Sequence, residues 1–142
     1  MFWLDTSVIS ELRKTGSSKV NSQVEERATS IPATQTFISV IAIFEIERGV
    51  LRMERRDRQQ GKILRTWLND YVLTHYSDRI IPISTRIAQR CVSLHVPDPM
   101  PDHDALIAAT ALEHSLTVVT RNIGGFERTD AKLFNPWATD VE

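Results

Sequence analysis

Cysteine is almost absent from this sequence of 142 residues, and its scarcity excludes several kinds of site. With Cys91 as the single cysteine, the chain cannot form an internal disulfide or a zinc site built from several thiolates. The surrounding segment RIAQRCVSLHV has apolar residues at helical spacing, which predicts that Cys91 is a buried core residue and not a nucleophile. This cysteine usage favours a reducing compartment.

Long hydrophobic runs and a strong net charge are also missing. The longest apolar run, FISVIAIFEI, contains Glu45 and is too short to cross a bilayer. The first residues, MFWLDTS, lack the basic and apolar regions of a secretory signal. We therefore expect a cytoplasmic protein that has no membrane segment. The formal net charge of −1 points to no partner, and the length suits a single domain over residues 1–142.

Positive charge is nevertheless concentrated in one stretch. Residues 48–65, RGVLRMERRDRQQGKILR, contain seven Arg or Lys residues against two acidic residues. Such a run is usually the solvated face of a helix. The functional alternative is a surface that contacts the phosphates of RNA, for which the candidates are Arg55, Arg56 and Arg58.

Short apolar strands alternate with amphipathic helices along the whole chain. Strands are expected at 2–4, before Ser39, and in the segments DRIIPIS, LTVVT and KLFNPW. Helices are expected at 7–14, 19–29, 40–56 and 58–75, over about fourteen residues before HVPDPMP, and at 102–115. Alternation of this kind predicts an α/β fold with a central, mostly parallel sheet.

The opening segment MFWLDTSVISEL raises the question of what Asp5 does directly after a buried strand. In one interpretation, Asp5 or Thr6 caps the helix that follows by accepting backbone N–H bonds. In the other, Asp5 is a ligand or catalytic group, because sites in α/β sheets lie at the carboxyl ends of strands. More carboxylates are needed to decide between them.

Two further acids stand in unusual places. Glu45 lies among apolar residues in VIAIFEIERGV, where it is either an edge residue whose head reaches water or a partly buried acid that needs a partner or a cation. Asp104 lies in the first turn of the helix DHDALIAATALEHS, where an acid also complements the helix dipole. Asp102 is the expected N-cap of that helix.

A parallel sheet would bring these three acids to the same edge. Asp5, Glu45 and Asp104 would repel one another there unless a divalent cation lay among them. We expect the side chain of His103 to point away, so an oxygen-liganded ion such as Mg²⁺ or Mn²⁺ is favoured. A carboxylate-held ion of this type supports phosphodiester hydrolysis.

Two other acid-bearing α/β folds fit less well. A phosphorelay receiver needs a lysine where Thr120, Arg121 and Asn122 stand. A haloacid-dehalogenase-like phosphatase needs a second aspartate at the position of Ser7.

The motifs LDTSVISEL, SVIAIFEIERGV, HDALIAATALEHSLTVVTRN and FNPW resemble those of PIN-domain ribonucleases, specifically toxins of the VapC/FitB type. The resemblance implies a PIN-like three-layer α/β/α sandwich and an endoribonuclease that cleaves RNA phosphodiester bonds with Mg²⁺ or Mn²⁺. It also implies a toxin–antitoxin module with a cognate antitoxin protein. The family's three main acids correspond to Asp5, Glu45 and Asp104, and Thr6 and Thr120 match hydroxyl positions that line its site.

The chain departs from this pattern after LTVVT. Many family members carry an acid at the position of Asn122 or just before the following Phe, where this chain has Gly125. Asn122 can still form a hydrogen bond with a metal-bound water. The departure leaves open an alternative, a catalytically weak or inactive PIN-like domain that binds RNA or a partner.

The last expectations concern the oligomeric state of the chain and its inhibition by a partner. The resemblance implies a homodimer, and the helices at 39–55 and 58–75 carry more large apolar residues than one sheet layer needs: Phe44, Met53, Trp67 and Tyr71. Alternatively, these residues complete the core of the monomer. An antitoxin is expected to insert an Arg or Lys among the three acids, because its charge replaces that of the cation.

Overall fold

The computed structural model describes residues 1–138, so the last four residues of the expected domain lie outside the described part. Its strands are β1 (Phe2–Leu4), β2 (Thr36–Ser39), β3 (Ile80–Ile81), β4 (Thr117–Val119) and β5 (Lys132–Phe134). Its α-helices are α1 (Thr6–Leu12), α2 (Ser22–Thr29), α3 (Val40–Arg56), α4 (Arg58–Thr66), α5 (Leu73–His75), α6 (Thr85–Ser93) and α7 (Asp102–His114). The remaining helical turns are η1 (Ala33–Gln35), the π-helix η2 (Trp67–Val72) and η3 (Ile123–Gly125).

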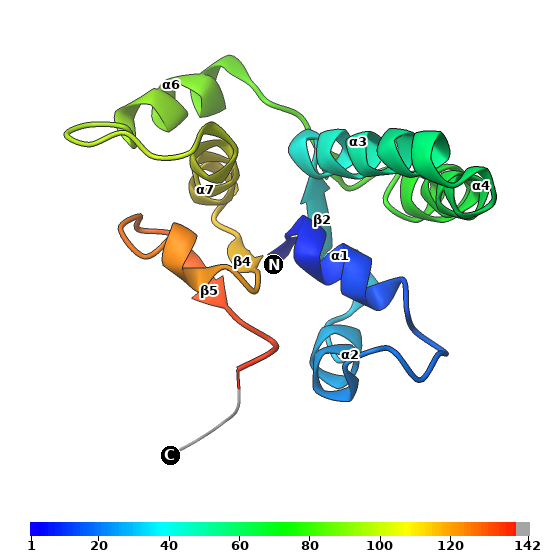
Figure 1. The fold of residues 1–142 in the computed structure, drawn as a ribbon. Coiled ribbons are helices and arrows are strands. Elements are labelled where there is room, and N and C mark those ends of the chain that lie inside the picture. Colours follow the sequence, from blue (N-terminus) through cyan, green and yellow to red (C-terminus); the bar gives the residue numbers. More distant parts are fainter. Residues whose placement is uncertain (139–142) are drawn as a thin grey trace.

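The strands form one sheet in the order β3-β2-β1-β4-β5, and each described strand pair is parallel. Alternate residues of a strand face opposite layers: Leu4 and Val119 pack with α1 and α3, whereas Trp3 and Val118 pack against α7. Figure 1 shows α6 and α7 on one side of the sheet and α1 to α4 on the other. The expected α/β/α sandwich is thus confirmed.

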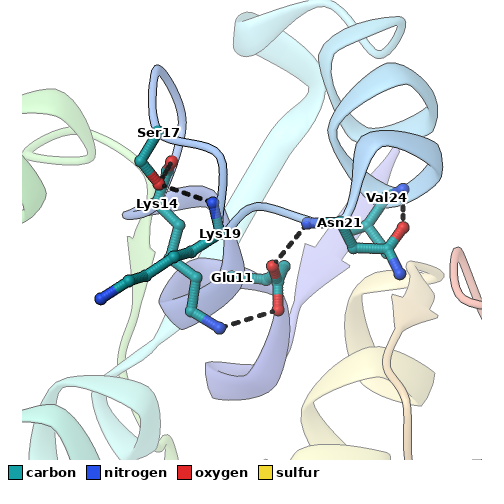
Figure 2. A network of polar contacts seen from close by, with 6 residues as sticks. All are labelled: Glu11, Lys14, Ser17, Lys19, Asn21 and Val24. Carbon is teal, nitrogen blue, oxygen red and sulfur yellow. Dashed lines mark hydrogen bonds and ion pairs between the residues drawn. The ribbon is translucent and has the colours of Figure 1, made fainter.

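A polar network fixes the connection between α1 and α2 (Figure 2). Glu11 accepts hydrogen bonds from the backbone N–H of Asn21 at 2.9 Å and from Lys14 Nζ at 3.4 Å, and the first of these bonds is the main reason that the pKa of Glu11 is lowered. Asn21 Oδ1 accepts from the N–H of Val24 at 3.1 Å and so caps α2. The helix therefore begins at Ser22 and not at residue 19 as expected.

Other helices also differ from expectation, beginning with α1, which spans Thr6–Leu12 and not 7–14. Helix α6 has nine residues instead of about fourteen, because it begins only after its cap, Ser84, and ends at Ser93. Asp102 is the first residue of α7 and not its N-cap; Pro101 holds the cap position, with no side-chain capping bond. The helix expected at 58–75 is present but passes through the π-helix η2.

Helices α3 and α4 form a closely packed hairpin, seen at the right of Figure 1. Gly61 permits the close approach, because a Cβ there would overlap the backbone of Glu54. Arg65 donates two hydrogen bonds to Glu47, at 2.6 and 2.7 Å, and reaches Glu54 at 3.2 Å. Arg65 of the basic stretch thus belongs to the structure of the hairpin.

The structure also shows where Cys91 lies and how apolar the helices are. Cys91 is buried between α6 and α7, as expected for a core residue, and burial raises the pKa of its thiol. Within residues 1–138, no helix combines the length and apolar character needed to cross a bilayer.

Candidate active site

The carboxyl ends of β1, β2 and β4 meet at one edge of the sheet, and the candidate site begins there. Leu4 pairs with Val119, so the next residues, Asp5 and Thr120, lie side by side. The N–H of Asp5 continues the ladder with a 3.0 Å bond to the carbonyl of Val119. Strand β2 leads through Ser39, which caps α3, to Glu45 in the second turn of that helix.

Asp5 is the residue around which the site is organised. Its Oδ1 accepts the N–H of Thr6 at 2.9 Å and so caps α1. Its Oδ2 accepts hydroxyl bonds from Thr120 at 2.7 Å and from Ser7 at 3.4 Å. The capping interpretation is therefore confirmed, and the same carboxylate is held by hydroxyl groups at the sheet edge.

Glu45 faces Asp5 from α3. The Thr6 hydroxyl donates to Glu45 Oε1 at 3.3 Å, which links the helix after β1 to the helix after β2. Burial is the largest cause of a raised pKa for Glu45, and repulsion from Asp5 is the second. A groove of about 220 Å³ opens beside Glu45 between α1 and α3. Glu45 is thus partly buried and lies next to another acid. This arrangement agrees with the interpretation of Glu45 as a partly buried acid.

Asp104 faces Asp5 from the other side, in the first turn of α7. Its pKa is raised by burial first and by the charge of Asp5 second. The charge of Asp5 therefore acts on both Glu45 and Asp104, and the structure brings the three predicted acids to one edge of the sheet.

The turn after β4 completes the site. Thr120 is fully buried, and its Oγ1 accepts the N–H of Asn122 at 3.0 Å while donating to Asp5. Asn122 Oδ1 accepts the N–H of Gly125 at 3.3 Å. A Cβ on Gly125 would lie 2.5 Å from Asn122 Nδ2 and 3.0 Å from Asp104 Oδ2. Gly125 therefore leaves room for both side chains.

His103 lies at a contact between α7 and α3. Its ring packs against Phe44 at a centroid distance of 5.4 Å, and its charge acts on both Glu45 and Asp104, lowering their pKa values against the larger effects of burial and Asp5. Arg48 also lowers the pKa of Glu45 and lies over the ring of Phe44. The contact between His103 and Phe44 joins α7 to α3, so it could not be predicted from the order of residues along the chain.

The donor set is suited to a hard cation, but the carboxylates do not converge on one point. Within residues 1–138, no group of three or more His, Cys, Asp or Glu side chains has an arrangement that could hold a metal ion. Asp5, Glu45 and Asp104 instead lie around the carboxyl edge of the sheet. Burial first and Asp5 second raise the pKa of Glu45 and Asp104. Carboxylate and hydroxyl oxygens are the ligands that Mg²⁺ and Mn²⁺ prefer.

The basic candidates lie apart from the acids. Arg55 comes ten positions after Glu45 on α3, which is about 15 Å along the helix axis. Arg55, Arg56 and Arg58 are exposed at the junction of α3 and α4. The structure therefore places them on the hairpin and not in the site.

Comparison with known proteins agrees with this geometry. The model of the PIN domain family matches residues 2–132. Toxin FitB of Neisseria gonorrhoeae is 31% identical over 96% of this chain and 99% of its own length. Ribonuclease VapC14 of Mycobacterium tuberculosis is 41% identical over 49% of this chain and 65% of its own length.

Solved structures show the same fold. The crystal structure of FitAcB from Neisseria gonorrhoeae superposes with a TM-score of 0.88 at 30% identity, over 98% of this chain and all of that one. FitAB bound to a DNA fragment gives the same TM-score at 28% identity, over 100% of this chain and 99% of that one. With its parallel sheet, its acids at the carboxyl edge and a match across nearly the whole length, this chain belongs to the PIN-domain family.

Proposed function

We propose that this protein is the toxin of a toxin–antitoxin module, a metal-dependent endoribonuclease that cleaves RNA phosphodiester bonds in the cytoplasm. The observation that carries the proposal is the placement of Asp5, Glu45 and Asp104 at the carboxyl edge of the parallel sheet, where burial first and the charge of Asp5 second raise the pKa of Glu45 and Asp104. Its relatives include a protein named as a toxin and one named as a ribonuclease.

In this proposal Asp5, Glu45 and Asp104 would hold Mg²⁺ or Mn²⁺ once the ion drew their carboxylates, which repel one another in its absence, toward a common point. When bound, the ion offsets negative charge on the phosphate and activates water for attack. The chain's own contribution is to orient the ligands. Thr6 holds Glu45, and Thr120 holds Asp5, through the hydroxyl bonds described above.

Asn122 has a supporting role in the same proposal. Its Oδ1 fixes the turn at Gly125, which leaves its Nδ2 free of any described hydrogen bond and close to Asp104. The amide can therefore orient water in the site, but it adds no negative charge for the cation. Three carboxylates remain, a sufficient set for an ion that keeps several waters.

The exposed arginines of the α3–α4 hairpin are proposed to contact RNA phosphates. Replacing them together by glutamine should weaken RNA binding and reduce the slope of log affinity against log salt by about 2, since each phosphate contact on a single strand contributes roughly 0.7. The residues are Arg55, Arg56 and Arg58. An unchanged salt slope would assign the run to a solvated helix face.

We also propose a homodimer and an inhibiting antitoxin. Of the apolar residues expected to be left over, Phe44 and Tyr71 are about half exposed, whereas Trp67 packs against the core. Tyr71, Ile63 and Leu73 are exposed large apolar residues of the segment from α4 to α5, and we propose this segment as the subunit contact. Light scattering of the isolated chain tests this, and a strict monomer at micromolar concentration would contradict it.

The antitoxin would place an Arg or Lys among the acids of the site. Co-expression with the neighbouring reading frame, followed by co-purification and an RNA cleavage assay of the complex, tests this part. Undiminished cleavage by the complex would contradict an inhibitory partner.

The experiment that tests the nuclease proposal is cleavage of total RNA by the purified chain, with Mg²⁺ or Mn²⁺ and with a chelator. We expect discrete fragments only in the presence of the ion. RNA binding without cleavage under all metal conditions would instead support a non-cutting PIN-like module, the alternative that Asn122 and Gly125 favour.

A further inference from the structure

An exposed aromatic side chain stands directly beside the acids. Phe44 precedes Glu45 on α3 and keeps 52% of its surface exposed. The ring of His103, from α7, packs on it edge to face at 5.4 Å with an interplanar angle of 88°. The Arg48 guanidinium lies 5.2 Å from the centroid of the Phe44 ring. A large apolar ring is thus kept at the rim of the site instead of in the core.

The two basic members of this cluster are electrostatically part of the site. His103 is the neighbour of Asp104 in the first turn of α7, and its charge acts on Glu45 and on Asp104. Arg48 acts on Glu45. The Arg48 guanidinium and the His103 ring therefore both contact an exposed ring whose neighbour in the chain is Glu45.

This combination matches the chemistry of unpaired RNA. Aromatic rings and guanidinium planes stack on nucleobases, and nearby cations attract the linking phosphates. A nucleobase inside an RNA duplex cannot stack on this ring, because the neighbouring base pairs already cover both faces of the base. The positive charge of Arg48 also favours a polyanion over a second copy of this chain, because the second copy would bring another Arg48 to the same place.

We propose that Phe44, together with Arg48 and His103, forms a stacking platform for a nucleobase adjacent to the scissile phosphate, and that this platform selects unpaired RNA. The inference rests on the proposed nuclease function and adds a specificity element to it. Phe44 is a binding residue in this view, and it takes no part in holding the cation.

Steady-state cleavage tests the platform. The substrate is a 5′-fluorescein-labelled, single-stranded RNA of twelve nucleotides that spans a site first mapped with the wild-type protein on total RNA. The variants are Phe44→Ala, Phe44→Leu and Phe44→Trp. The control is Leu51→Ala, because Leu51 is also exposed, at 56%, and lies two turns further along the same helix.

Loss of one stacked base predicts a KM increase of roughly 5- to 150-fold for Phe44→Ala, with kcat changed less than about threefold. Phe44→Leu should resemble Phe44→Ala, because leucine is apolar but has no π-face, whereas Phe44→Trp should retain the wild-type KM. Arg48→Gln should reduce the salt slope of binding by about 0.7, and Phe44→Ala should leave it unchanged. Leu51→Ala should match the wild type.

A substrate-side change completes the test. An abasic nucleotide next to the cleaved bond should raise the wild-type KM and abolish the difference between wild type and Phe44→Ala. An unchanged KM for Phe44→Ala, while the wild type cleaves, would overturn the platform alone. A wild-type protein that cleaves no RNA would remove the nuclease proposal as well. Loss of dimers on light scattering of Phe44→Ala would assign the ring to a subunit contact and also overturn the platform.

Discussion

Adjacent glycines in the turn after β4 offer a matched test of the site geometry. Gly124 and Gly125 both lie in η3, and neither has a positive φ, so alanine suits the backbone at either position. A Cβ on Gly124 would meet no atom within 4 Å. A Cβ on Gly125 would point at Asn122 and Asp104. The same substitution therefore enters open space in one case and the candidate site in the other.

The two substitutions should have different effects on stability. Gly124→Ala should stabilise the protein by about 0.4–1 kcal/mol through the entropy of the unfolded chain, which raises Tm by about 1–5 °C. Gly125→Ala gains the same entropy but breaks the bond from its N–H to Asn122 Oδ1, at a cost of about 1 kcal/mol. Because the overlapping atoms are the ends of flexible side chains, its net change should stay within about 1 kcal/mol.

The effect on activity should be much larger at one position. Carbon contacts are optimal at about 3.5–4.0 Å, so the Asn122 amide, 2.5 Å from the new Cβ, must retreat by about 1 Å. Displacements of that size in a catalytic site cost up to about 100-fold. We expect Gly125→Ala to lower kcat/KM by about 10- to 100-fold and Gly124→Ala to leave it unchanged.

Thermal unfolding and RNA cleavage kinetics, measured on the same preparations, check this prediction. The informative quantity is the loss of activity relative to the change in Tm. Wild-type activity in Gly125→Ala, or equal losses in the two variants, would refute the placement of Asn122 and Asp104 around this turn.

Other predictions concern charge and packing. In metal-free protein, burial and then Asp5 raise the pKa of Glu45 and Asp104, so above pH about 4 the folded state binds more protons than the unfolded state. Stability in EDTA should therefore fall as pH rises through the raised pKa values, and less so in Asp5→Asn; identical urea-unfolding profiles for the two proteins would contradict this. Gly49→Ala, which enters open space, should stabilise α3 by about 0.5–1 kcal/mol, whereas Gly61→Ala, which overlaps the α3 backbone, should cost about 1–3 kcal/mol. Thermal melts check this pair, and Tm shifts of the same sign would contradict the hairpin packing.

Much of the fold and the acids of the site could be predicted because period-two and period-3.6 patterns are strong in this chain. The strand before Asp5 and the cap at Ser39 fix where two helices begin, and the parallel sheet then brings Asp5 and Glu45 to one edge. These predictions depend on local pattern and on one topological rule, which is why they could be made without a structure.

Sequence reasoning missed one contact between distant segments and misplaced one helix cap. His103 was expected to point away from the acids. The approach of α7 to α3 sets where its ring lies, which is against Phe44, and from there its charge acts on Glu45. Asp102 was expected to cap α7, but Pro101 precedes it and holds the cap position. The contact between His103 and Phe44 leaves no periodic signal in the sequence.

Titration of the protein with Mn²⁺ by isothermal calorimetry tests most directly whether these carboxylates hold a divalent cation. The wild type should bind the ion at a site shared by Asp5, Glu45 and Asp104, and each of Asp5→Asn, Glu45→Gln and Asp104→Asn should weaken binding by tenfold or more. Gly124→Ala serves as the control and should bind as the wild type does. Undiminished Mn²⁺ affinity in Asp5→Asn would contradict a metal site at this edge of the sheet.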